Sequence, residues 1–199
     1  MPVKKERQYR SMTIAVQPAA DSKLIESEYY VEGYATTFER YKLYDTEEGG
    51  IYEQMSPDCF AECDMSDVIM QYDHCGRVFA RQSNGTLVLI VDEKGLKIGA
   101  DLSKTEEARK LYEDIKEGMC TKMSFSFMPQ EWKYDKDTRT IVHTKIKKVF
   151  DVSAVSLPAN DTTEINSRNF CDGVIAKVKQ ELLMREKQKL ELKIKLGGF

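Results

Sequence analysis

Strict alternation of apolar and polar residues marks the middle of the chain as a series of strands. In residues 123–127 (MSFSF) the methionine and the two phenylalanines fall on one face and the two serines on the other, as in a strand with one buried side. The pattern as a whole predicts a mainly β fold. The expected strands cover residues 29–38, 68–72, 77–83, 86–92, 96–102, 123–127, 132–134, 140–147 and 150–157.

Turn signals suggest how some of these strands are connected. Asn-Gly at 84–85 separates two of them and predicts a hairpin, because this dipeptide adopts the left-handed conformations of a tight turn. A second hairpin is expected around residues 135–139 (DKDTR). Residues 39–57 mix charges with two adjacent glycines, so they predict a long connection, followed by a short helix over 57–60 that begins with proline.

Two segments change to a helical period. Apolar residues at helical spacing predict a helix over 104–117, and Ser103 with Glu106 fits a capping box at its start. A second helix is predicted from residue 172 onward. Residues 177–195 carry seven basic and three acidic residues, whereas the rest of the chain carries 23 basic and 30 acidic residues. We therefore expect a domain over 1–170 and a basic amphipathic helix or tail over 171–199.

Composition narrows the class of protein. The 199 residues are 41% hydrophobic and 32% charged, and the net charge of −3 does not indicate nucleic acid or an anionic membrane as partner. No apolar run approaches the roughly 20 residues of a membrane span, and the basic start lacks the apolar stretch of a signal peptide. Five cysteines, an odd number, favour reduced thiols and a cytosolic setting.

The candidate chemistry centres on a serine and a histidine. Ser124 lies on a predicted strand between bulky apolar neighbours, and His74 follows another strand. A serine hydroxyl becomes an effective nucleophile when an imidazole accepts its proton. That imidazole needs an acceptor on its other ring nitrogen, and the sequence offers Asp151 or His143 for this role. The combination predicts a serine hydrolase that needs no cofactor.

Two other kinds of site fit the sequence less well. Zinc could use Cys59, Cys63, His74 and Cys75, but the spacings do not match the usual two-plus-two arrangement. Cys75 or Cys120 as a nucleophile would need a separate histidine at a suitable distance. We therefore expect no metal, and these cysteines are interpreted as small apolar residues.

The order and spacing of several short runs resemble the prohead (capsid maturation) serine protease family of tailed phages, in its HK97-type branch, over about residues 8–168. The runs are GYATTF at 33–38, Asp73-His74, Gly95-Leu96, MSFSF at 123–127, Trp132 and DVSAVSLPAN at 151–160. The resemblance implies a fold related to the herpesvirus assembly proteases, an antiparallel β-barrel of about six to eight strands with a few surrounding helices.

The resemblance also implies roles for residues. His74 would be the base and Ser124 the nucleophile. Asp151, 27 residues after the serine, fits the spacing of the third member better than His143, 19 residues after it. The oxyanion hole would come from the loop after the last strand, where Ala159 or Asn160 would have to donate because Pro158 has no N–H.

One position departs from the family. Ser126 stands where relatives commonly have glycine, and its side chain could either hydrogen-bond into the site or crowd it.

The resemblance further implies a capsid maturation protease acting inside the immature capsid, in the cytoplasm of a bacterial host. Its partners would be the major capsid protein, whose scaffold segment it would cleave, and itself through self-cleavage, with a homo-oligomer as one form. A non-catalytic capsid-assembly or scaffold-binding module on the same barrel is the alternative. Hydrolysis of a small ester is a third interpretation, although the chain lacks the Gly-x-Ser-x-Gly elbow of the α/β-hydrolases.

Overall fold

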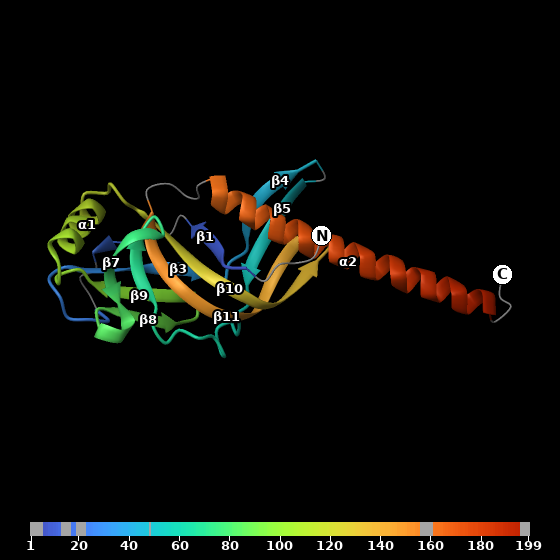
Figure 1. Cartoon of the computed structure of the whole chain (residues 1–199), viewed down its shortest axis with the longest axis horizontal. Helices are drawn as coiled ribbons and strands as arrows, with labels where there is room; N and C mark the ends of the chain where they lie inside the picture. The colour runs from blue at the N-terminus through green and yellow to red at the C-terminus, as the bar shows by residue number, and fades with distance from the viewer. Residues whose placement is uncertain (1–5, 13–16, 19–22, 48, 156–160, 196–199) are drawn as a thin grey trace.

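A computed structural model describes residues 6–12, 17–18, 23–47, 49–155 and 161–195. Its strands form two sheets, of seven and four strands (Figure 1). In the larger sheet the neighbours are, in order, β1 (Gln8–Met12), β10 (Lys122–Asp135), β11 (Thr140–Val155), β5 (Gly49–Met55) and β4 (Tyr41–Thr46), and β11 also pairs with the β6 (Ile69–Tyr72) and β7 (Cys75–Arg81) hairpin. The smaller sheet has the order β2 (Gln17–Pro18), β3 (Tyr30–Thr37), β9 (Gly95–Asp101) and β8 (Leu87–Val91).

The mainly β prediction is confirmed, but the described strands do not close into the expected barrel. The reason lies in β11, which pairs with β5 through residues 140–143 and with β6 through residues 151–154. One long strand thus serves two separate partners along the same edge, and the larger sheet branches there. The smaller sheet packs on it through side chains, with β3 contacting β10.

The β10–β11 hairpin is the central element of the larger sheet, and β1, β5 and β6 pair with it. Four of the predicted strands are parts of these two, and the turn over 135–139 is where the sequence placed it. Met123, Phe125 and Phe127 are fully buried on one face of β10, and the two phenylalanine rings stack with centroids 4.7 Å apart. Burial of this face fixes the orientation of the serines between them.

Two predictions about the connections are wrong. Residues 39–57 contain β4 and β5, which form a hairpin with each other, and β5 also pairs with β11. The pairing of β5 with β11 is non-local and leaves no signal in the local sequence. Asn84 ends a short 3₁₀ helix (Gln82–Asn84), and Gly85 takes the left-handed conformation after it. Because β7 pairs with β6 and β8 with β9, residues 84–85 connect the two sheets and close no hairpin.

The short helix expected over 57–60 is also absent, since these residues form turns. The helix predicted over 104–117 is confirmed as α1 (Glu106–Lys116). Its cap is Thr105, whose hydroxyl accepts a hydrogen bond from the amide of Ala108, in place of the predicted Ser103.

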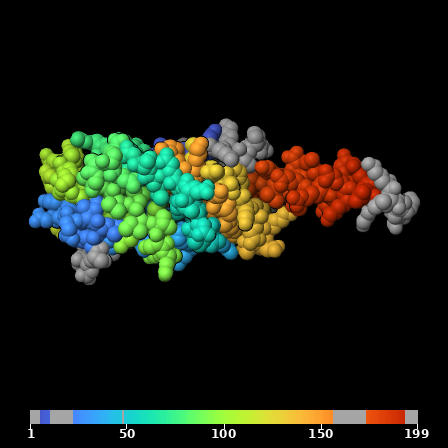
Figure 2. Space-filling model, turned by 90° about the horizontal axis from the view of Figure 1, so that it is seen from below, coloured from blue at the N-terminus to red at the C-terminus, as the bar shows by residue number. Residues whose placement is uncertain are grey.

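Helix α2 (Asp161–Lys195) begins before the predicted boundary at residue 171 and runs through it. Val174 on this helix is buried in a small core with Tyr44, Ile51 and Ile141. Beyond that contact the helix projects away from the body, as the cartoon and the space-filling view both show (Figures 1 and 2). No helix within the described residues combines the length and apolar character that a membrane crossing requires.

Gly95 provides a test of the smaller sheet. A Cβ added to it would lie 2.2 Å from the carbonyl oxygen of Thr36 and 2.6 Å from Cα of Thr37, and these backbone atoms belong to β3. We expect Gly95→Ala to lower the free energy of unfolding by about 1–3 kcal/mol, measured by urea denaturation. Gly50→Ala is the matched control, since its Cβ would meet only the Tyr52 side chain. Equal losses in the two variants would contradict the described packing.

Candidate active site

Ser124 sits on β10, where its neighbours hold it in place. Met123 and Phe125 are buried in the core on the opposite face, and Ser153 of β11 is the residue paired with Ser124 across the hairpin. Ser124 is itself fully buried. Its hydroxyl lies on the polar face of β10, where the backbone carbonyl oxygen of Arg10 is 2.9 Å away.

His74 lies in the tight turn between β6 and β7, two residues after Tyr72, where both the predicted strand and β6 end. Tyr72 and Cys75 close this turn, and Asp73 and His74 between them have φ of 47° and 57°, the left-handed region. Asp and His tolerate this region better than most residues do. The amide of Asp73 donates a hydrogen bond to the carbonyl of Ala154 at 3.0 Å, which ties the turn to β11.

The turn brings three side chains together. His74 Nε2 lies 2.5 Å from Ser124 Oγ, and His74 Nδ1 lies 2.5 Å from Asp151 Oδ1. The ring of Tyr9, on β1, packs edge-on against the imidazole with centroids 4.9 Å apart. Ser124 and Asp151, which follow His74 by 50 and 77 positions in the sequence, are thus linked through its imidazole by hydrogen bonds.

Asp151 is fully buried on β11 and accepts four side-chain hydrogen bonds. His74 and Ser153 donate to Oδ1, the latter at 2.9 Å, and Ser126 and Arg7 donate to Oδ2. Burial alone would raise the pKa of this carboxyl, but the hydrogen bonds from His74, Ser126 and Ser153 hold the pKa below its usual value. Asp151 is therefore an anion at neutral pH.

An ionised Asp151 determines the tautomer of His74. A carboxylate can only accept, so Nδ1 carries the proton and Nε2 presents its lone pair to the Ser124 hydroxyl. The arrangement can remove a proton from the serine and stabilise the resulting imidazolium through the buried negative charge. It has the chemical capacity for nucleophilic catalysis by serine.

His143, the alternative third member, lies elsewhere. It is fully buried, not facing solvent as a lone strand histidine would suggest, and its Nε2 is 2.7 Å from Glu53 Oε1 on β5. Glu53 supplies the buried acceptor that makes this position tolerable for an imidazole. Ser126 does not crowd the site, because its hydroxyl bonds to the Asp151 carboxylate.

The geometry of the described residues adds no support for a cysteine nucleophile or for a zinc site. Burial raises the pKa of Cys120 to about 11, so it is not a thiolate at neutral pH. Cys75 is exposed, so its interpretation as a buried apolar residue is wrong. Within the ranges that the structure describes, no group of three or more His, Cys, Asp or Glu side chains is placed to hold a metal ion. The oxyanion-hole candidates Ala159 and Asn160 lie outside the described residues.

Several residues around the site were not predicted from the sequence. Ser153 is recognisable as a strand residue two positions after Asp151, on the same face. Arg7, Arg10 and Glu53 gave no local signal, because Arg7 and Arg10 stand in a charged N-terminal stretch and Glu53 in an apparent connection. Only the pairing of β1 with β10 and of β5 with β11 brings them here.

A strand serine, an imidazole and a buried carboxylate in this sequence of contacts define the class of serine hydrolases. The comparison with family models narrows the class: the model of the caudovirus prohead serine protease matches residues 18–176. The chain belongs to this family and is a serine endopeptidase of the capsid maturation type. Neither the curated proteins nor the solved structures gave a match.

The lowered pKa of Asp151 predicts a pH dependence of stability. The carboxylate stabilises the fold above the ordinary aspartate range, near about pH 3.9, and this contribution is lost as the pH falls below it. We expect the difference in unfolding free energy between wild type and Asp151→Asn to shrink between pH 7 and pH 3, in urea titrations. The corresponding difference for Gly50→Ala, which involves no titrating group, should stay constant. A constant difference for Asp151→Asn would contradict the assigned charge.

Proposed function

We propose that this chain cleaves scaffold segments from the major capsid protein, with Ser124 as nucleophile, His74 as general base and Asp151 as the residue that orients His74. The observation that carries the proposal is the pair of 2.5 Å contacts from Ser124 to His74 and from His74 to Asp151. Membership of the prohead protease family supports the same chemistry and the capsid protein as substrate.

The mechanism follows from these contacts. Ser124 Oγ attacks the carbonyl carbon of the scissile peptide, while its proton passes to His74 Nε2. The imidazolium, stabilised by Asp151, gives that proton to the leaving amine, and the amine departs to leave an acyl-enzyme. Water then attacks the ester with His74 again as base, which releases the acid and restores the serine. Ala159 or Asn160 remains the predicted oxyanion donor, a contribution of about 2.7–4 kcal/mol per donor.

The setting of the reaction is part of the proposal. We place the enzyme inside the immature capsid, in the cytoplasm of the bacterial host, where it cleaves itself as well as its substrate. Peptide fragments are small enough to leave the shell, so cleavage vacates space for DNA. Assembly of the enzyme into a homo-oligomer would be compatible with this setting.

The non-catalytic alternative, a scaffold-binding module, predicts a different result with an active-site serine probe. Covalent labelling at Ser124 that is lost in His74→Ala favours the protease. A probe that never reacts, with shells that assemble normally, favours the module.

Capsid cleavage itself tests the proposal. When the chain is co-expressed with its capsid protein, we expect Ser124→Ala to leave the scaffold segment attached, as read from the intact mass of the capsid protein. Asp151→Asn should slow the cleavage by about 10⁴-fold, the loss that an equivalent change causes in a known triad. Ser66→Ala is the matched control, since Ser66 is an exposed serine whose hydroxyl bonds to Asp64. Normal cleavage by Ser124→Ala would refute the assignment.

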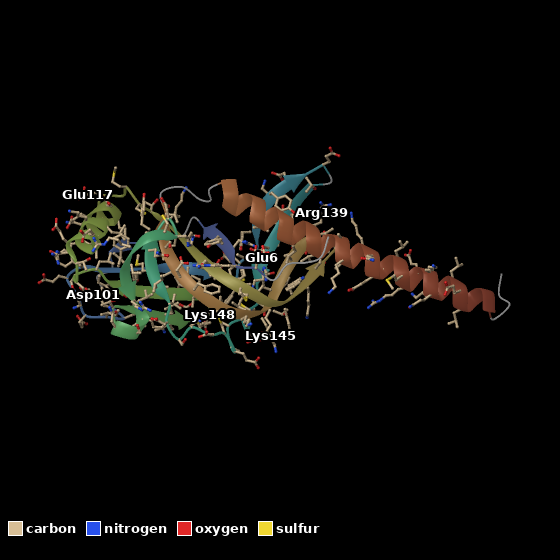
Figure 3. All side chains as sticks on the ribbon, in the orientation of Figure 1. Glu6, Asp101, Glu117, Arg139, Lys145 and Lys148 are labelled. Atoms are coloured by element: carbon tan, nitrogen blue, oxygen red, sulfur yellow. The ribbon has the colours of Figure 1, made fainter. Side chains whose placement is uncertain are left out.

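The outer part of α2 is proposed as a docking element distinct from the catalytic body. Its side chains stand clear of the body (Figure 3), and Leu183, Met184, Leu190 and Leu192 are exposed among basic residues. A basic helix with apolar positions suits an acidic, scaffold-like partner.

Removal of residues 177–195 is expected to reduce incorporation of the protein into shells, measured by co-sedimentation. Cleavage of a short peptide in solution should be unchanged, because Val174 and the core contact it makes remain. Unchanged incorporation would contradict the docking role.

A further inference from the structure

The two oxygens of the Asp151 carboxylate have different partners. Oδ1 lies 2.5 Å from His74 Nδ1 and accepts a hydrogen bond from the Ser153 hydroxyl at 2.9 Å. Oδ2 accepts from Ser126 and from Arg7. Rotation of an aspartate carboxylate about its Cβ–Cγ bond is soft, so the direction of Oδ1 depends on what holds Oδ2. The contacts of Oδ2 therefore bear on the alignment of His74.

Ser126 lies directly across the β10–β11 hairpin from Asp151. The two residues are partners in the pairing of these strands, so their side chains leave the sheet on the same face. Ser126 is fully buried, and its hydroxyl donates to Asp151 Oδ2. A hydroxyl has one proton to donate and two lone pairs that can accept. The direction of the Ser126 proton is therefore set by the donors that bind its oxygen.

Arg7, the residue before β1, provides those donors. Its Nε and Nη2 donate to Ser126 Oγ at 3.1 Å and 2.8 Å, and Nη2 also donates to Asp151 Oδ2. The planar guanidinium has its N–H groups in fixed directions, which suits contact with two neighbouring oxygens. Arg7 thus acts on Oδ2 twice, directly and through the Ser126 hydroxyl.

Two aromatic rings hold the guanidinium of Arg7. Its carbon lies 4.6 Å from the centroid of the Phe150 ring and 5.2 Å from that of the Tyr9 ring. Contacts of this kind stabilise a cation and leave the N–H groups at its edge available. The Arg7 side chain is nevertheless 38% exposed. A small solute can therefore reach the position of its guanidinium.

Arg7 also gives the buried carboxylate a permanent cation. Asp151 is fully buried, and a buried anion without a cationic partner is strongly unfavourable. His74 becomes a cation only when it has taken the serine proton. An arginine is charged throughout, so Asp151 has a cationic partner in both states of the imidazole.

We propose that Arg7 and Ser126 are positioning residues that fix Oδ2 of Asp151. With Oδ2 fixed, Oδ1 stays in line with His74 Nδ1 while the imidazole accepts the serine proton. Neither residue touches the reacting atoms, and each acts through Asp151. Because Arg7 also orients the Ser126 hydroxyl, the two residues work as one unit. This inference rests on the proposed protease function and adds two residues to its machinery.

The competing explanation is that Arg7 only fastens the N-terminal segment to the sheet. Its loss would then loosen β1 and have no specific effect on Asp151. Ser126→Ala separates the two explanations, because it removes a hydroxyl of β10 and none of the backbone hydrogen bonds that pair β1 with β10.

The first experiment is a double-mutant cycle in the full chain, measured as the rate constant at which a saturating fluorophosphonate labels Ser124. We expect Arg7→Ala and Ser126→Ala each to lower this rate constant about tenfold, which corresponds to about 1.4 kcal/mol. The double variant should also be about tenfold slower than wild type, because each residue depends on the other. Independent contributions would add in free energy and give a loss of about 100-fold.

Arg77→Ala is the matched control for the loss of an arginine near the site. Arg77 follows His74 by three positions, and its side chain is 64% exposed and pairs with Glu107 of α1. We expect this variant to be labelled at the wild-type rate.

The second experiment restores the guanidinium from solution. Ethylguanidinium has the atoms that Arg7→Ala removes, and we expect it to raise the labelling rate of this variant severalfold. Ethylammonium at the same concentration should not, because it carries the charge without the planar set of donors. Wild type should respond to neither. An arginine that only fastened the segment could not be replaced in this way, since the added cation is not attached to β1.

The outcomes separate failure of the inference from failure of the proposed function. Equal labelling of wild type and the single variants, or a loss of about 100-fold in the double variant, would overturn the inference and leave a working protease. A slow Arg7→Ala that ethylguanidinium does not restore, with a normal Ser126→Ala, would overturn it in favour of simple fastening. Absence of labelling in the wild type, together with uncleaved capsid protein, would overturn the protease function and the inference with it.

Discussion

The buried carboxylate of Asp151 is the interaction on which the site depends. An ionised group removed from water must be surrounded by donors, and this one collects them from a β6–β7 turn, from both strands of the β10–β11 hairpin and from the N-terminal segment before β1. The same requirement orients His74, because the only lone pair the imidazole has left faces Ser124. The donors that make burial of the Asp151 carboxylate possible are therefore the same contacts that align Asp151, His74 and Ser124.

The alternating face of β10 explains why Ser124 could be recognised in the sequence. Met123, Phe125 and Phe127 had to be buried together, and that left the serines on the face where His74 arrives. The spacing to Asp151 followed from the family resemblance. The local sequence could not predict that β11 also pairs with β5. This pairing buries Glu53 and His143, although the residues next to each of them in the sequence are compatible with an exposed position.

The errors in the fold have the same physical origin. Asn84-Gly85 forms a tight left-handed turn as its residues favour, but the strands on either side belong to different sheets. Turn chemistry specifies the local bend and not the partner of the strand that follows. The barrel expected from the resemblance likewise depended on which strand edges meet, and here β11 divides its edge between β5 and β6.

The tautomer of His74 tests the central claim most directly, because every role assigned to the site depends on Asp151 holding the proton on Nδ1. Nitrogen NMR of ¹⁵N-histidine-labelled protein at neutral pH distinguishes a protonated Nδ1 from a protonated Nε2. The account predicts that His74 carries its proton on Nδ1 in the wild type and loses this preference in Asp151→Asn. A proton on Nε2 in the wild type, or a preference unaffected by Asp151→Asn, would contradict it.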